Sequence, residues 1–186
     1  RARRLDATWD PSLGPDGLAV AAERLAADAL TAAHAGAELV VLSDRAFGLG
    51  RPPLPSALAA GAVHTALTGA GLRGRTDLLA DAADGLDVHA AAMVLAAGAT
   101  AVRPRLAIEL AAELAGSRGA EELTVERAVA NLLAGFEAGL RKTMARMGIG
   151  TAASYVGGAQ FEVLELAPEV IERCFPAAPS WPGTVG

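Results

Sequence analysis

Three consecutive polar residues, Ser43, Asp44 and Arg45, directly follow an apolar run that reads ELVVL over residues 38–42. A short, continuous apolar run between turn signals is typical of a strand that is buried on both faces of a parallel sheet. The carboxyl ends of such strands are where α/β folds place their binding sites. One interpretation is that Arg45 contacts an anion or a substrate and that Asp44 orients it. The other is a local ion pair that holds the loop after the strand.

The three histidines, His34, His64 and His89, fall in three different predicted helices. Histidines that bind a metal usually stand at i and i+4 on one helix or have cysteine or carboxylate partners nearby, and this spacing is missing here. Isolated helical histidines are more often packed or surface residues. His64 and His89 stay candidates for a contact in space, which spacing along the chain does not decide. We therefore predict no metal site in this chain.

Other patterns that suggest chemistry are weaker. Residues 69–74 read GAGLRG and match the glycine spacing of a dinucleotide-binding loop, but they follow a predicted helix and precede a predicted strand, the reverse of the required order. Cys174 has no obvious neighbouring base, so we expect a packed thiol. Met144 and Met147 are candidates for lining a channel or a flavin, although their i, i+3 spacing is more typical of a core. We assign no catalytic and no cofactor-binding residue.

The elements that must position these residues alternate between strands and helices up to about residue 110. Apolar runs between turn signals predict strands at residues 5–9, 38–42, 77–80 and 99–102. Helical spacing and stop signals predict helices at residues 18–34, 56–70 and 87–97. This order is the signature of an α/β fold with a parallel sheet and flanking helices.

The chain changes character after Pro104, where helical patterns follow one another. They predict helices at residues 105–115, 124–147, 152–166 and 168–174, the third of them broken at two consecutive glycines. Thr124 is a suitable N-cap for the long helix, and Glu126 in its first turn suits the positive end of the helix dipole. We therefore expect an α/β portion over residues 1–115 and a helical connector over residues 116–186.

Composition limits the classes of protein and partner. The chain has 186 residues, of which 52% are hydrophobic and 4% aromatic, so a core of small side chains and modest stability are expected. The net charge of −5 and the lack of a basic stripe argue against nucleic acid as a partner. The first four residues, RARR, are interpreted as a solvated end. A single cysteine fits the reducing cytoplasm, and no apolar run is long enough to span a membrane.

Several segments form a recognisable series when they are taken in order. The series contains LDATWD, GAELVVLSDR, RPPLPSALAAGAVHTAL, VHAAAMVLAAGATAVRP, RKTMARMGIGTAASY and EVIERCFPAAPS. In this order the segments resemble the large (alpha) subunit of glutamate synthase, and the Ser-Asp-Arg and Met-Gly-Ile blocks together make the resemblance specific. The matching part of that family is the later portion of its central domain and the connection toward its FMN barrel.

The resemblance implies an enzyme that converts glutamine, 2-oxoglutarate and a reductant into two glutamates. It places FMN and a 3Fe-4S cluster in other parts of the full-length enzyme and none in this segment. It implies a partial barrel-like central domain that supports its neighbours and helps to conduct ammonia. The expected partners are the adjacent amidotransferase and FMN domains of the same polypeptide and a small reductase subunit or ferredoxin. Candidate tunnel or domain contacts are Ser43, Asp44, Arg45, His64, His89, Met144, Met147 and Tyr155.

The chain departs from the family pattern at several polar positions. Thr65 follows His64 where the family usually has a further histidine, and Arg103 and Arg105 flank a proline where the family has Asn-Pro-Tyr. Trp181 replaces an expected arginine. These losses leave open a second interpretation, a diverged, stand-alone central-domain module with a non-catalytic role in binding or assembly. An unrelated small α/β protein is the third.

Overall fold

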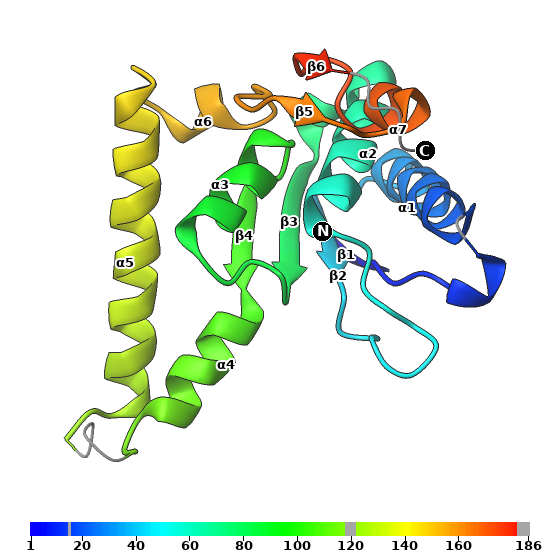
Figure 1. Cartoon of the computed structure of the whole chain (residues 1–186). Coiled ribbons are helices and arrows are strands. Elements are labelled where there is room, and N and C mark those ends of the chain that lie inside the picture. The colour runs from blue at the N-terminus through cyan, green and yellow to red at the C-terminus, as the bar shows by residue number, and fades with distance from the viewer. Residues whose placement is uncertain (15, 118–121, 182–186) are drawn as a thin grey trace.

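The computed structural model describes residues 1–14, 16–117 and 122–181. Four parallel strands form its main sheet in the order β1–β2–β3–β4, with bounds Ala2–Asp6, Leu39–Ser43, Asp77–Ala82 and Ala101–Pro104. The connections between successive strands contain α1 (Asp16–His34), α2 (Ser56–Gly69) and α3 (Val88–Ala96), as Figure 1 shows. Two short 3-10 helices, η1 and η2, span Pro11–Leu13 and Arg73–Arg75. The predicted α/β fold with a parallel sheet and flanking helices is confirmed.

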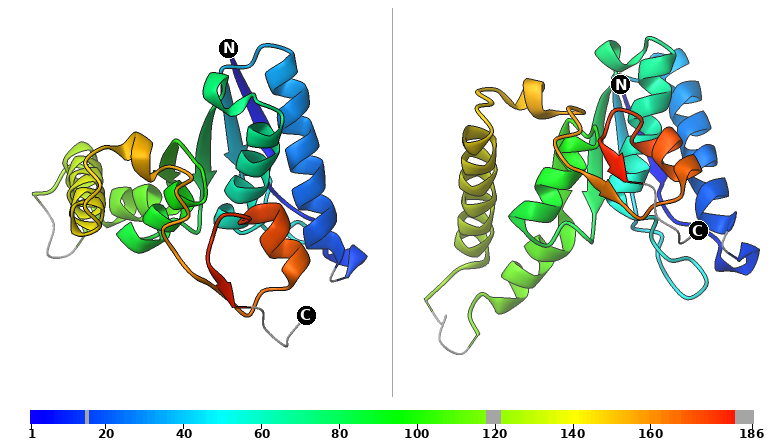
Figure 2. Two further views of the ribbon diagram at one scale, coloured as in Figure 1. Left: turned by 90° about the horizontal axis from the view of Figure 1, so that it is seen from above. Right: turned by 45° about the horizontal axis from the view of Figure 1, so that its top comes forward.

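One face of the sheet packs against the three connecting helices (Figure 2). Alternate strand residues point toward them, and Val40 and Leu78 in adjacent strands are 0% exposed. The helices meet this face with small residues such as Ala29 and Ala60, which are also fully buried. Small side chains let the helices approach closely, so packing is tight although each residue buries little apolar area. The expectation of a core built from small side chains therefore holds.

The opposite face of the sheet, which we call the open face, lacks such a helical cover within the described residues. Its side chains are exposed or only partly buried at most positions and become buried only toward the carboxyl ends of β2 and β3. Strands in sequential order with their helices on a single side are the arrangement of a (βα)8 barrel, and here four strands form an open sheet. The open face comprises Ala2, Arg4, Asp6, Leu39, Val41, Ser43, Asp77, Leu79, Asp81, Ala101 and Arg103.

The first strand begins earlier than the sequence predicts. The apolar pattern favoured residues 5–9, whereas β1 spans Ala2–Asp6 and pairs with β2 along its whole length. Only Leu5 of this strand is buried, because β1 lies at the edge of the sheet and most of its side chains face solvent. The arginines of the RARR start are therefore solvated, as expected, but their backbone belongs to the sheet.

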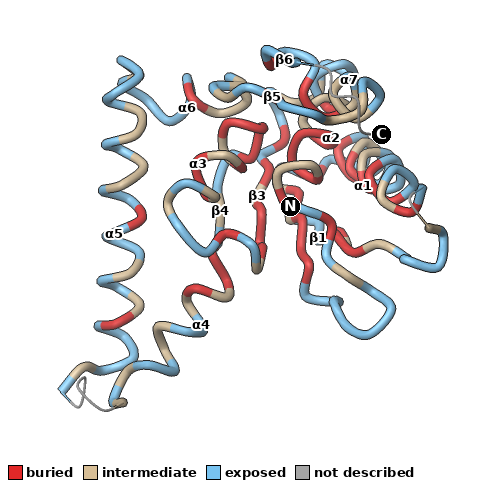
Figure 3. Tube along the Cα trace, viewed as in Figure 1, coloured by how far each residue is buried: buried red, intermediate tan, exposed pale blue. Residues whose placement is uncertain are grey.

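The second half of the chain starts with α4 (Arg105–Leu114) and α5 (Val125–Arg146), which pack on each other. The helix α5 also contacts α3, and most of its surface is exposed (Figure 3). Its inner side buries Phe136 against Ala91 of α3 and Ala107 of α4. The long helix predicted at residues 124–147 is thus present, and Thr124 caps it by accepting a hydrogen bond from the backbone of Arg127.

The last part of the chain is less helical than predicted. The structure has α6 (Ala152–Tyr155), β5 (Val163–Leu164), α7 (Pro168–Cys174) and β6 (Ser180–Trp181). The helix predicted at residues 152–166 is wrong beyond α6, because Gly157 has a φ of 68° and the chain then turns toward α3. The backbone N–H groups of Gly157 and Ala159 donate to the carbonyls of Leu95 and Ala96 at the end of α3. Backbone hydrogen bonds to α3 thus replace those of the predicted helix.

Close packing of α7 on α2 yields a testable prediction about Gly61. A Cβ atom at this position would lie 2.3 Å from the carbonyl oxygen of Cys174. Gly61→Ala should therefore lower the free energy of unfolding by about 1–3 kcal/mol, because backbone atoms must shift to admit a methyl group. Gly69→Ala in the same helix is the matched control, since no atom lies within 4 Å of the place its methyl group would take. Urea unfolding of both variants checks this, and equal stabilities would contradict the close contact.

Candidate functional site

A row of polar residues crosses the open face where the strands end. Asp6, Ser43, Asp81 and Arg103 stand in register on four adjacent strands. Barrel-like folds place their sites at this end of the strands. The row therefore occupies the position in which the sequence placed a site, although only Ser43 was among the predicted residues.

Asp81 is the centre of this row and is 3% exposed. Its carboxylate accepts hydrogen bonds from Ser43 Oγ at 3.2 Å, Arg45 Nε at 2.7 Å and Arg103 Nη1 at 2.9 Å. Burial alone would raise the pKa of Asp81, but the hydrogen bonds and charges of Arg45 and Arg103 outweigh it and lower the pKa. Asp81 is therefore a stable carboxylate that holds two arginines and is poorly suited to act as a base.

Asp44 points to the opposite, helix-covered side of the sheet and is 4% exposed. It accepts hydrogen bonds from Arg105 Nη2 at 2.6 Å and from the backbone N–H of Ala83 at 2.7 Å. Burial would lower the pKa of Arg105, but its bond with Asp44 and the charges of Asp44 and Glu109 raise it, so the guanidinium stays charged. A buried ion pair thus joins the end of β2 to the first residue of α4.

The predicted Ser-Asp-Arg group is therefore divided between the two faces of the sheet. Asp44 neither orients Arg45 nor pairs with it, because consecutive residues at a strand end point to opposite sides. Arg45 instead bonds to Asp81 of β3, and Asp44 to Arg105 of α4. Ion pairs do hold this region, as one interpretation proposed, but they link different elements. Sequence reasoning missed Asp81 and Arg105. The Asp81 pair depends on the register between β2 and β3, and the Arg105 pair depends on where α4 begins.

A second polar cluster lies at the other end of the sheet and contains His64. Its Nδ1 accepts a hydrogen bond from Arg73 Nε at 3.1 Å, and Arg73 also donates to the carbonyls of Thr76 and Gly98, each at 2.8 Å. The imidazole fills the space above Gly98 and Gly157, where a Cβ atom would fall within 2.5 Å of the ring. Burial and the charge of Arg73 lower the pKa of His64, so the ring is neutral near pH 7.

The remaining predicted contact residues do not join either cluster. His89 is exposed near the start of α3, whereas His64 packs against Gly98 beyond its end, so the suggested contact between the two histidines is absent. Met144 packs with Tyr155, which is 2% exposed and whose pKa is raised by burial. Met147 nearby is 46% exposed. Tyr155 is the last residue of α6, which lies away from the carboxyl ends of the strands (Figure 1).

An apolar pocket of about 440 Å³ lies beside His64, with Phe161, Cys174 and Phe175 in its wall. Burial raises the pKa of Cys174 to about 11, so its sulfur is a thiol and a poor nucleophile. Cys174 is buried, as expected for a packed thiol. Among the described residues no group of three or more potential metal-binding side chains converges. The polar side chains in its wall are thus those of His64, Thr65 and Thr68, and its cysteine is not a nucleophile at neutral pH.

Residues 1–167 match the family model of the glutamate synthase central domain. This chain belongs to that family. It is 38% identical over 176 residues to the glutamate synthase (NADPH) large chain of Azospirillum brasilense, covering 95% of this chain. It is 39% identical over 172 residues to glutamate synthase (NADH) of Schizosaccharomyces pombe, covering 92% of this chain. It is 34% identical over 183 residues to a chloroplastic ferredoxin-dependent glutamate synthase of Oryza sativa, also covering 92%.

The resemblance read from the sequence motifs is therefore confirmed. The chain spans 8–12% of the length of these relatives, so most of a glutamate synthase lies outside the matched region. The match extends from β1 through α6 and β5, which places both polar clusters inside the central-domain region of the family.

The buried pair in this central-domain segment predicts a large effect of Asp44→Ala. The change leaves the guanidinium of Arg105 buried without its main carboxylate partner, so the free energy of unfolding should fall by about 3–5 kcal/mol. The double variant Asp44→Leu/Arg105→Met should be more stable than Asp44→Ala, because it removes both charges. Glu109→Ala is the control and should cost less than about 1 kcal/mol, since Glu109 is exposed. Urea unfolding of the four proteins tests this, and equal losses would contradict it.

The neutral His64 predicts a pH dependence of stability. Its folded-state pKa lies below the unfolded value of about 6.5, so the unfolded chain takes up protons first on acidification. The stabilisation is fully present above pH 6.5 and is lost as the pH falls from there toward the lowered pKa. His64→Asn keeps an acceptor for Arg73 but does not titrate, so the wild type should lose more stability than this variant, by up to about 1.4 kcal/mol per pH unit. Parallel slopes in urea titrations between pH 5 and 7 would contradict this.

Proposed function

We propose that this chain is the supporting central-domain segment of a glutamate synthase polypeptide that forms two glutamates from glutamine, 2-oxoglutarate and a reductant. The observation that supports this role is that the arginines at the strand ends bond to carboxylates of the same segment. Arg45 and Arg103 both bond to Asp81, and Arg105 bonds to Asp44. The groups that would bind a substrate in a barrel-like enzyme are thus paired with carboxylates of the segment itself. The chemical steps belong to other domains.

The geometry of the helical hairpin fits a supporting role. The Asp44–Arg105 pair fixes the start of α4 to the sheet, and Phe136 and Gly139 anchor α5 on α3. The helix α5 has 22 residues and is therefore about 33 Å long. Its outer surface is largely exposed and is available to a neighbouring domain (Figure 3). The division into an α/β portion over residues 1–115 and a connector over residues 116–186 is part of this proposal.

Cofactors and partners follow from the same proposal. FMN and a 3Fe-4S cluster would be held by another domain of the polypeptide, and an amidotransferase domain would release ammonia. The electron donor stays open between a small reductase subunit and ferredoxin, because NADPH, NADH and ferredoxin all occur in the names of the relatives.

We propose a cytoplasmic location. None of the helices in the described ranges 16–114 and 125–174 is long and apolar enough to cross a membrane.

Ammonia conduction is the second part of the proposed role, and the open face is the surface that would bear it. Ser43 and Arg45 lie at its carboxyl end, where Ser43 is 3% exposed and Arg45 has a side chain that is 42% exposed. Of these two predicted contact residues, Arg45 is therefore the one that a passing molecule or a neighbouring domain reaches more readily. Asp44, His64, His89, Met144, Met147 and Tyr155 stay predictions as domain contacts.

The proposed function is tested in the polypeptide that contains this chain. With glutamine, 2-oxoglutarate and an electron donor it should form glutamate, and failure to do so would favour the diverged, non-catalytic module. Arg45→Ala should lower the free energy of unfolding by about 1–3 kcal/mol, because the buried carboxylate of Asp81 loses one of its two arginines and keeps Arg103. We expect the ratio of glutamate formed to glutamine consumed to stay unchanged, as a supporting residue requires. A lower ratio in a variant that is folded at the assay temperature would assign Arg45 to the ammonia path.

A further inference from the structure

The strand β1 forms one edge of the sheet, and on its outer side Ala2 and Arg4 have no backbone partner among the described residues. The N–H of Leu39 donates to Arg1 O, and the N–H of Ala7 donates to Ser43 O, so odd-numbered residues bond to β2. In a parallel ladder the intervening residues direct their N–H and C=O groups to the other side. Ala2 and Arg4 are therefore ready to pair with a further strand.

The carboxyl end of the same edge is already closed. Arg24 of α1 donates from Nη2 to the carbonyls of Asp6 at 3.0 Å and Thr8 at 2.9 Å. Arg51 from the β2–α2 loop pairs with the carboxylate of Asp6. A strand that pairs with this edge would thus form its backbone hydrogen bonds with Ala2 and Arg4. It would end near Arg24, because Arg24 already occupies the carbonyls of Asp6 and Thr8.

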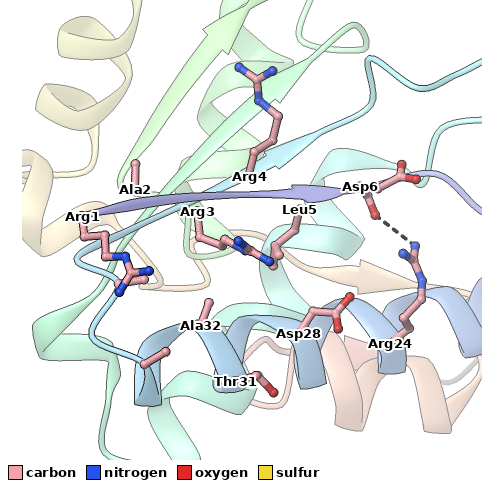
Figure 4. Close-up of a pocket in the computed structure, with 12 residues that line it drawn as sticks. Arg1, Ala2, Arg3, Arg4, Leu5, Asp6, Arg24, Asp28, Thr31 and Ala32 are labelled. Atoms are coloured by element: carbon pink, nitrogen blue, oxygen red, sulfur yellow. Dashed lines mark hydrogen bonds between the residues drawn. The ribbon is translucent and has the colours of Figure 1, made fainter.

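A groove of about 580 Å³ runs between β1 and α1 (Figure 4). The side chains of Arg1 and Arg3 enter it from β1, and Arg24 and Asp28 line it from α1. Among the described residues no carboxylate pairs with Arg3, and Asp28 is the one acidic residue of α1 in the lining. The side chains that line the groove therefore carry a net positive charge.

These charges decide which strand can pair with the edge. Two copies of β1 placed side by side would bring arginines together, so self-pairing is disfavoured. A strand with carboxylates would gain both backbone hydrogen bonds and charge pairing. The arginines on β1 thus have two effects, since they discourage aggregation through this edge and select an acidic partner.

We propose that the β1 edge binds an extended, acidic strand from another part of the same polypeptide. This inference rests on the proposed function, because it requires the remainder of a glutamate synthase, of which the chain spans 8–12% in the relatives. The added strand bonds to Ala2 and Arg4, and its carboxylates face Arg3 in the groove and Arg4 on the open face. The open sheet is thereby extended by a fifth strand.

Hydrogen exchange in the full-length polypeptide tests this inference at single amides. The N–H groups of Ala2 and Arg4 should exchange at least about 100-fold more slowly than unstructured amides, because a paired strand covers them. Arg3→Glu should remove at least about tenfold of this protection by repelling the acidic strand. Arg75→Glu is the matched control, an equal charge change at an exposed arginine outside the groove, and should leave the protection intact.

Two results would overturn the inference. Exchange of Ala2 and Arg4 at unstructured rates in the wild-type polypeptide would show that no strand pairs with this edge. Protection that survives Arg3→Glu would show that an acidic partner is not selected. Both readouts are independent of glutamate formation, so a polypeptide that is active but unprotected refutes this inference alone. An inactive polypeptide with protected amides refutes the proposed function and leaves the strand in place.

Discussion

The buried pair between Asp44 and Arg105 is the contact that joins the two halves of this segment. Both residues are at most 5% exposed, and they connect the end of β2 to the first residue of α4. A buried pair contributes little net stability, but the loss of one partner is costly, so the pair enforces a single arrangement more than it stabilises. The direction in which α4 leaves the sheet, and with it the position of α5, depends on this contact.

The two sides of the sheet perform different tasks because strand side chains alternate. The helix-covered side contains Val40, Leu78 and the Asp44 carboxylate, and it builds the core. The open face contains the Asp81 cluster, whose arginines are partly solvated. In a closed barrel the equivalent face would enclose a site. Here the charges of Asp6, Asp81 and Arg103 at the carboxyl end of this face are paired within the segment, so the face is polar although no barrel closes over it.

Much of the architecture follows from local sequence, and most of the site does not. The alternation of apolar runs and helical spacing predicts the parallel α/β order, and the ELVVL run lies within one residue of β2. The partners of Asp44 and Arg45 require the register of β3 and the start of α4, which no local pattern contains. The helix predicted beyond Tyr155 fails because backbone bonds to α3 compete with helical ones. Family motifs identified the segment, and the three-dimensional structure explained its polar residues.

The position of β1 explains why the charged start of the chain was difficult to interpret. A strand inside a parallel sheet is apolar on both faces, whereas an edge strand tolerates charge on both. Arg3 and Arg4 therefore break the apolar pattern by which a strand is predicted from sequence. In the structure their charges disfavour pairing of β1 with a second copy of itself. A free edge of a parallel sheet favours aggregation, and these arginines oppose it. The sheet thus combines a stable core with an edge that excludes its own copies while its backbone groups remain able to pair.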